Sequence, residues 1–122
     1  MATIALIAHD GKKADMVAFA MQHTETLRHF DIVATGTTGQ LLVEKVGLTV
    51  ERMLSGPIGG DAQIAAMVAD HKITAVFFFL DPLGKHPHDP DIQMLMRLCN
   101  VHNVPLATNA ATAACIIDAL TD

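Results

Sequence analysis

The sequence contains no tryptophan and no tyrosine, and its only aromatic side chains apart from histidine are five phenylalanines. Proteins that bind single-stranded nucleic acid stack the bases on aromatic side chains, which are scarce here. Basic residues are also few, because eight lysines and arginines stand against thirteen aspartates and glutamates, a net charge of −5 with neutral histidines. A chain with this charge and no basic run does not attract a long polyanion, so we expect no nucleic-acid partner.

Long apolar runs and paired cysteines are missing as well. No apolar run approaches the ~20 residues that a membrane-spanning helix needs, so we expect no membrane partner. The first residues, Met1–Ile4, lack a basic segment followed by a cleavable apolar stretch, and we therefore expect the protein in the cytoplasm. Cys99 and Cys115 have no metal-ligand spacing and lie in apolar segments, so we interpret both as reduced core residues.

The rest of the composition is typical of a folded globular domain. The chain has 122 residues, of which 51% are apolar and 17% charged. This length predicts one domain, residues 1–122, with one hydrophobic core. Because aromatic residues are so few, we expect that core to be aliphatic and rich in methionine.

Two patterns alternate along the chain. Short apolar runs, typical of strands covered on both faces, span residues 3–8, 31–34, 48–53, 73–80 and 104–107. Apolar residues at helical spacing fill residues 13–29, 40–46, 62–70, 91–101 and 110–120. This alternation predicts an α/β fold, a doubly wound (Rossmann-like), mainly parallel five-stranded sheet with helices on both faces. Right-handed crossovers then place every strand-to-helix loop at one edge of the sheet, where ligands bind.

Polar residues and glycines follow each predicted strand. They occupy His9–Lys13, Thr35–Gly39, Ser55–Asp61, Asp81–Pro82 with His86–Asp91, and Thr108–Asn109. Because all five segments are expected at the same edge, we predict a functional site there.

The segment Thr35–Gly39 is suited to binding a phosphate group. Glycines allow close backbone approach, a following helix offers free N–H groups, and Lys12 or Lys13 supplies charge. The alternative is a glycine turn in which Thr38 caps the next helix. The spacing matches neither a Walker loop nor a dinucleotide fingerprint, which favours a small phosphate ester.

Asp61 follows a second glycine-rich segment and opens a predicted helix. One interpretation is a helix N-cap, and the other is a general base. An aspartate with the reference pKa of ~3.9 is already ionised at pH 7, so a base at this position needs placement more than activation.

Residues 86–91, His-Pro-His-Asp-Pro-Asp, are open to three interpretations. The two histidines could bind a metal, but only if further ligands converge on it. The segment could be a rigid loop in which Asp89 caps the next helix. Alternatively, an aspartate orients a histidine that donates to a developing oxyanion or moves a proton. We expect neither a metal nor another cofactor.

Six segments together resemble the methylglyoxal synthase family. They are Ile4–Asp10, Ala34–Gly39, Met53–Asp61, Phe78–Leu83, Pro87–Asp91 and Pro105–Asn109. The resemblance runs in order through nearly the whole chain. It implies a lyase that converts dihydroxyacetone phosphate through an enediol phosphate into methylglyoxal and inorganic phosphate. It also implies a homohexamer and allosteric inhibition by phosphate.

The resemblance assigns roles to individual residues. Asp61 is the catalytic base, and His88 lies against the substrate oxygens. The other acidic positions are Asp10, Asp81 and Asp91. The substrate-binding positions are His9, Lys13, Thr35, Gly36, Thr37, Thr38, Ser55, Gly56 and His88.

Two rival functions share part of this pattern. A regulatory domain like that of carbamoyl phosphate synthetase would bind a phosphorylated effector without catalysis, but it does not need Asp61, His88, Asp81 and Asp91. A phosphosugar isomerase or lyase with another substrate would share the first proton abstraction and differ in the fate of the intermediate.

Overall fold

A five-stranded parallel sheet forms the centre of the computed structural model, which describes residues 2–84 and 89–121. The strands are β1 (Thr3–Ala8), β2 (Asp31–Ala34), β3 (Val50–Arg52), β4 (Ala75–Phe79) and β5 (Leu106–Ala107), in the spatial order β3-β2-β1-β4-β5. Every neighbouring pair is parallel. The predicted fold class is therefore confirmed.

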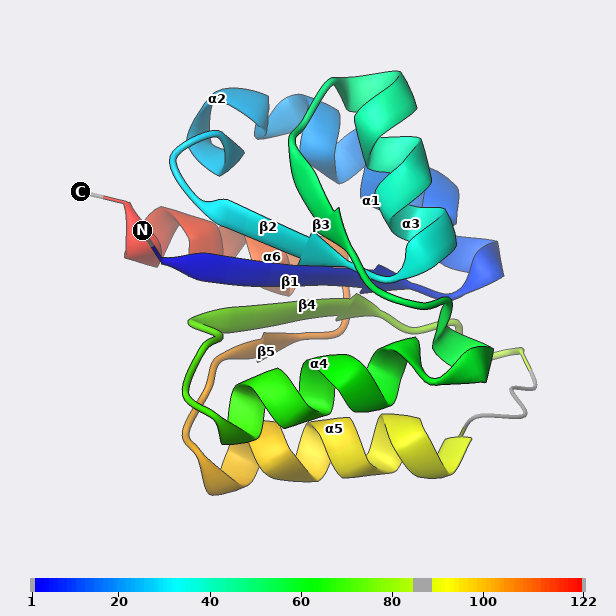
Figure 1. Cartoon of the computed structure of the whole chain (residues 1–122). Coiled ribbons are helices and arrows are strands. Elements are labelled where there is room, and N and C mark those ends of the chain that lie inside the picture. The colour runs from blue at the N-terminus through cyan, green and yellow to red at the C-terminus, as the bar shows by residue number, and fades with distance from the viewer. Residues whose placement is uncertain (1, 85–88, 122) are drawn as a thin grey trace.

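Helices cover both faces of this sheet (Figure 1). The longer ones are α1 (Lys13–Gln22), α4 (Gly60–Ala69), α5 (Asp89–Val101) and α6 (Ala110–Leu120). Shorter helices are α2 (Thr24–Leu27), α3 (Gly36–Leu41), the 3-10 turns η1 (Asp10–Lys12) and η3 (Gly56–Ile58), and the π-helix η2 (Leu42–Val46). Among the described helices, none has the length and apolar character needed to cross a bilayer.

The two faces of β1 belong to two separate apolar clusters. Ile4, Leu6 and Ala8 pack with α1 and α6, whereas Ala5 and Ile7 pack with α4 and α5. Side chains alternate between the faces of a strand, so a strand covered on both sides reads as one continuous apolar run. This double burial explains why residues 3–8 form one continuous apolar run in the sequence.

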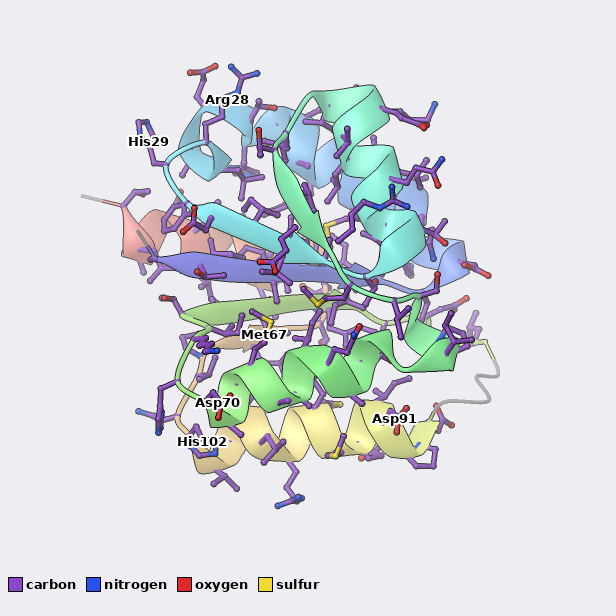
Figure 2. The ribbon with its side chains drawn as sticks, viewed as in Figure 1. Arg28, His29, Met67, Asp70, Asp91 and His102 are labelled. Atoms are coloured by element: carbon purple, nitrogen blue, oxygen red, sulfur yellow. The ribbon has the colours of Figure 1, made fainter. Side chains whose placement is uncertain are left out.

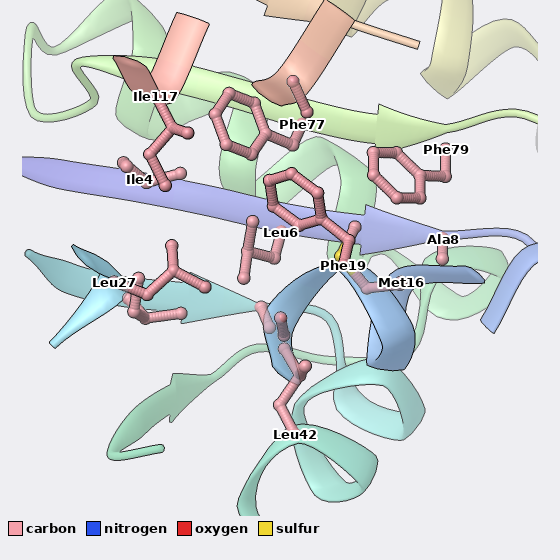
Figure 3. Packing of buried hydrophobic residues seen from close by; sticks show 14 of the residues in the cluster. Ile4, Leu6, Ala8, Met16, Phe19, Leu27, Leu42, Phe77, Phe79 and Ile117 are labelled. Carbon is pink, nitrogen blue, oxygen red and sulfur yellow. The ribbon is translucent and has the colours of Figure 1, made fainter. Parts of the chain in front are cut away.

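The core is more aromatic than the aliphatic, methionine-rich core that we expected, although Met53, Met67, Met94 and Met96 pack against one of its two clusters. Phe77 and Phe79 of β4 lie on either side of Phe19, nearly perpendicular to it, with ring centroids 5.7 and 5.6 Å from its own (Figure 3). Phe78 fills the opposite cluster. Met16 is the only methionine with a buried side chain in the described part of the chain. Three consecutive phenylalanines on a central strand supply bulk to both faces, so methionine is not required for it.

The helical pattern of residues 13–29 is interrupted in the structure. α1 ends at Gln22 and α2 begins at Thr24. The Thr24 hydroxyl donates to the Ala20 and Met21 carbonyls at 2.8 and 2.9 Å, so it takes up carbonyl groups at the end of α1. Side-chain bonds of this kind compete with the helical ladder.

The two cysteines lie in different environments. Cys99 is fully buried, as predicted, but Cys115 is exposed, so its assignment to the core was wrong. α6 buries Ala113 and Ile117, and a residue two positions from each lies on the opposite side of a helix. Burial removes the Cys99 thiolate from water and raises the pKa of that thiol to about 11.

This difference predicts selective thiol chemistry. The thiolate is the reactive form, and the raised pKa lowers its fraction at Cys99 roughly a hundredfold at pH 8. In the folded protein, a disulfide reagent should modify Cys115 quickly and Cys99 only after denaturation, as followed by mass spectrometry. The Cys115→Ser variant should show no fast phase, and a fast phase in that variant would contradict this account.

Candidate functional site

A cavity of about 450 Å³ opens at the edge of the sheet where β1, β2, β3 and β4 end. Most of the residues that the sequence assigned to the site line it. They are His9, Asp10, Lys13, Thr35, Thr37, Thr38, Ser55, Gly56, Asp61 and Asp81. The cavity therefore combines segments that are far apart in the sequence, as the parallel arrangement predicted.

Asp61 lies in the first turn of α4 and is fully buried. The N-cap of α4 is Gly59, with φ at 115°, so the interpretation of Asp61 as an N-cap is wrong. Gly60 allows the start of α4 to pack against the backbone of Leu54, because a Cβ at this position would lie 1.9 Å from the Leu54 carbonyl oxygen. Only glycine lets α4 begin this close to the segment after β3, and this contact fixes the base of the Asp61 side chain.

His9 and Asp81 join the ends of the two central strands. The Asp81 N–H donates to His9 Nδ1 at 2.9 Å, although these residues are 72 positions apart. Because Nδ1 accepts this bond, a neutral His9 ring carries its proton on Nε2 and is a donor there. The Asp81 carboxylate accepts the Leu83 N–H at 3.0 Å and packs against Gly11, where a Cβ would be only 2.5 Å from Oδ2.

Among the described residues that line the cavity, Lys13 is the lysine. Its Nζ donates to the Ala8 carbonyl at 3.1 Å and to Asp10 Oδ1 at 2.7 Å. The lysine side chain is largely buried, whereas the Asp10 side chain is almost fully exposed. Lys12 instead pairs with Asp15 at 3.6 Å and does not line this cavity. Of the two lysines that the sequence left open, Lys13 is thus the one placed at the site.

Four residues that bear hydroxyl groups line the same cavity as this lysine. Thr35 is the N-cap of α3, and Thr37 Oγ1 lies 3.5 Å from Ser55 Oγ. Thr38 is 2% exposed, and its hydroxyl has no hydrogen-bond partner among the described residues. Buried hydroxyls without a partner are rare and indicate a place for a bound polar group.

The segment Thr35–Gly39 is therefore not the loop that we predicted. Helix α3 begins at Gly36 and includes most of it, so the alternative in which Thr38 caps a helix is wrong. The structure uses Gly36 for packing, because a Cβ there would lie 2.9 Å from Ser55 Oγ. The Gly36 N–H donates to the Leu54 carbonyl at 3.2 Å. Gly36 borders the cavity without contributing to its described lining.

The two remaining sequence-predicted site residues are His88 and Asp91. His88 belongs to residues 85–88, outside the described part of the chain, as does His86. Asp91 is half-buried in the first turn of α5, at the edge where the strands end (Figure 2), but it is not among the described lining residues. Residues 2–84 and 89–121 contain no group of three or more acidic, histidine or cysteine side chains able to hold a metal ion.

One polar side chain beside the site was missed at the sequence level. Gln63 Oε1 accepts the Leu54 N–H at 2.8 Å, although Gln63 itself is exposed on α4. An exposed glutamine in a helix has no distinctive pattern, so only the packing of α4 against the segment after β3 identifies it.

The fold and the site together define an α/β protein with a buried carboxylate, a lysine and several hydroxyls at the carboxyl edge of a parallel sheet. A family model described as MGS-like domain matches residues 15–108. The methylglyoxal synthase of Thermus thermophilus is 56% identical over 117 residues, which cover 96% of this chain and 93% of the relative. That of Carboxydothermus hydrogenoformans is 54% identical and covers 98% and 99%.

A solved structure agrees with these sequence matches. The crystal structure of methylglyoxal synthase from Elizabethkingia anophelis has a TM-score of 0.90 and 46% identity, and the match covers 95% of this chain and 76% of that one. The chain therefore belongs to the methylglyoxal synthase family. The predicted family, its synthase activity and the lyase class are thereby confirmed.

The close contact at Gly60 gives a direct test of the site's construction. The Gly60→Ala substitution adds a methyl group 1.9 Å from the Leu54 oxygen, so α4 or the Leu54 segment must move. We expect a loss of about 1–3 kcal/mol in the free energy of unfolding, measured with urea, and a lower kcat. Alanine is the better helix former by about 1 kcal/mol, so a stability equal to or above that of the parent would contradict the steric account.

Proposed function

We propose that the protein converts dihydroxyacetone phosphate into methylglyoxal and inorganic phosphate, with Asp61 as the base. The observation that carries this proposal is a buried carboxylate in the same cavity as Lys13 and the hydroxyls of Thr35, Thr37, Thr38 and Ser55. A carboxylate removes protons, whereas hydroxyls and a lysine hold a phosphate group. Having both within about 450 Å³ suits a small phosphorylated substrate.

In this proposal, the phosphate group of the substrate occupies the side of the cavity formed by Lys13, Ser55 and the threonines. The buried Thr38 hydroxyl gains a partner when a phosphate oxygen arrives. Lys13 contributes positive charge, and its Asp10 partner is exposed enough for water to screen it. Gly56 lies at the start of η3 in the cavity wall, where a glycine gives the phosphate access to the backbone.

The first proposed step is a proton transfer. Asp61 removes a proton from the hydroxyl-bearing carbon beside the ketone, and the electrons of that C–H bond move to the carbonyl oxygen. That oxygen is protonated, which gives an enediol phosphate. The family resemblance assigns the stabilisation of this oxygen to His88, and the Nε2–H of neutral His9 is a second donor in the cavity. Asp10, Asp81 and Asp91 complete the acidic surroundings that the resemblance assigns to the base.

The second proposed step is the elimination. The enediol loses a hydroxyl proton, its electrons form a carbonyl group and a new C–C double bond, and the C–O bond to phosphate breaks. Phosphate leaves with the bonding electrons and takes up a proton, and the enol that remains becomes methylglyoxal. The groups around Lys13 stabilise the departing anion. Neither step uses an oxidant or a metal ion.

The remaining expectations from the family resemblance are also part of this proposal. Free phosphate resembles the group held by Lys13 and the hydroxyls, so it should compete with substrate as well as leave as product. We further propose a homohexamer with allosteric inhibition by phosphate, a single domain over residues 1–122, and a cytoplasmic location.

The assignment of Asp61 is tested by Asp61→Asn. A positioned base contributes about 10²–10⁴-fold to a rate, so kcat for methylglyoxal formation should fall by at least a hundredfold. KM for dihydroxyacetone phosphate should change little, because the phosphate-binding groups are intact. The assay uses a chelator and chemical trapping of methylglyoxal. The exposed Asp70→Asn at the C-cap of α4 is the control, and full activity in Asp61→Asn would reject the proposed base.

The phosphate site is tested by Thr38→Val, which removes one buried hydroxyl with little change in shape. A hydrogen bond to a charged group contributes about 1.5–3 kcal/mol, so KM and the inhibition constant of phosphate should both rise about tenfold or more. The exposed Thr112→Val on α6 should leave both constants unchanged. If Thr38→Val also leaves both unchanged, the phosphate lies elsewhere.

A further inference from the structure

The peptide groups of Leu54 connect the two halves of the cavity. The Leu54 N–H donates to Gln63 Oε1 on α4 at 2.8 Å, and the Leu54 carbonyl accepts the Gly36 N–H of α3 at 3.2 Å. Helix α3 carries Thr37 and Thr38, and α4 carries Asp61. The Leu54 backbone is therefore hydrogen-bonded both to α3, which carries the proposed phosphate-binding hydroxyls, and to α4, which carries the Asp61 carboxylate.

The hydrogen bond from the Leu54 N–H to Gln63 lies immediately after the last ladder bond of β3. The Met53 N–H still donates to the Ala34 carbonyl at 2.8 Å, so the strand ladder continues up to that residue. The Leu54 N–H is the next one along the chain, and a side chain of α4 accepts it. If Gln63 Oε1 is removed, the Leu54 N–H loses its hydrogen-bond acceptor on α4.

Gln63 does not belong to the cavity wall. It lies two residues after Asp61 on α4, it is exposed, and it is not among the described residues that line the cavity. Its effect on a ligand must therefore pass through Leu54 to the adjoining Ser55 and Gly56, which do line the cavity. Gly60 adds a second link, because its N–H donates to the Ser55 carbonyl at 3.0 Å.

From these contacts we propose that Gln63 is a positioning residue, whose side-chain oxygen ties the phosphate-binding segment Leu54–Gly56 to the helix that carries Asp61. The inference rests on the proposed function in assigning phosphate to this segment. When this hydrogen bond is lost, the backbone of Ser55 and Gly56 gains conformational freedom. Binding of phosphate must then restrict that freedom again, which weakens the binding. Asp61 keeps its place, since Gly60 and the packing of α4 are unchanged.

Two substitutions separate the acceptor oxygen from the bulk of the side chain. Gln63→Met keeps a long unbranched side chain without a comparable acceptor, whereas Gln63→Glu keeps an oxygen that can accept the Leu54 N–H. We expect Gln63→Met to weaken the binding of inorganic phosphate and to raise KM about fivefold, the effect of one ordinary hydrogen bond. Its kcat should stay within twofold of the parent. Gln63→Glu should remain close to the parent in both constants.

The experiment combines calorimetric titration of the full chain with phosphate, steady-state kinetics, and hydrogen exchange at the Leu54 amide. Exchange should accelerate in Gln63→Met and not in Gln63→Glu, and Gln93→Met on the exposed face of α5 is the control for a glutamine-to-methionine change. Unaltered phosphate affinity in Gln63→Met, even with a lower Tm, would overturn the proposal. Equal weakening in both variants would overturn it as well.

The phosphate titration keeps this test separate from the proposed function. If the parent protein forms no methylglyoxal from dihydroxyacetone phosphate, the proposed function fails, while the comparison of phosphate affinities still decides the role of Gln63. If the parent is active and the two variants bind phosphate as it does, only the positioning role fails.

Discussion

The parallel pairing of β1 with β2 and β4 is the constraint on which the rest of the site depends. It aligns Ile4 with Ile32 on one side and with Ala75 on the other, so these strands end at the same edge. His9 and Thr35 follow directly from the ends of β1 and β2, and Asp81 lies two residues after the end of β4. An antiparallel neighbour would send its following residues to the opposite edge, and no substitution of side chains could restore the cavity.

The site also shows how polar groups are kept next to a tightly packed apolar core. The rings of Phe78 and His9 pack in a T-shaped arrangement with their centroids 5.1 Å apart. Asp61 lies at the start of a helix whose next inward residues, Ile64 and Ala65, belong to the core. Such surroundings hold little water, so electrostatic interactions with a bound anion are stronger than at the surface. The backbone supplies much of the positioning, through the Ala8 carbonyl on Lys13 and the Asp81 amide on His9.

The sequence predicted the framework more securely than its details. The bounds of residues 3–8, 31–34 and 110–120 agree with β1, β2 and α6, because a strand buried on both faces and a helix between clear boundaries leave strong periodic patterns. The start of α3 was misplaced, because glycine and threonine favour turns locally and the packing of Gly36 against Ser55 is invisible in the local pattern. Cys115 was misassigned because a helix made mostly of small residues does not indicate which side faces the sheet.

The sequence alone determined the alternation of strands and helices, the common edge for the polar segments, and the family to which their combination belongs. Those properties follow from local periodicity and from short motifs. Only the tertiary structure decided that Lys13 and not Lys12 lines the cavity, that the Thr38 hydroxyl is buried, and that Gln63 holds the Leu54 amide. Such contacts join residues from separate elements, and their distances depend on strand register and on how closely glycines let helices approach.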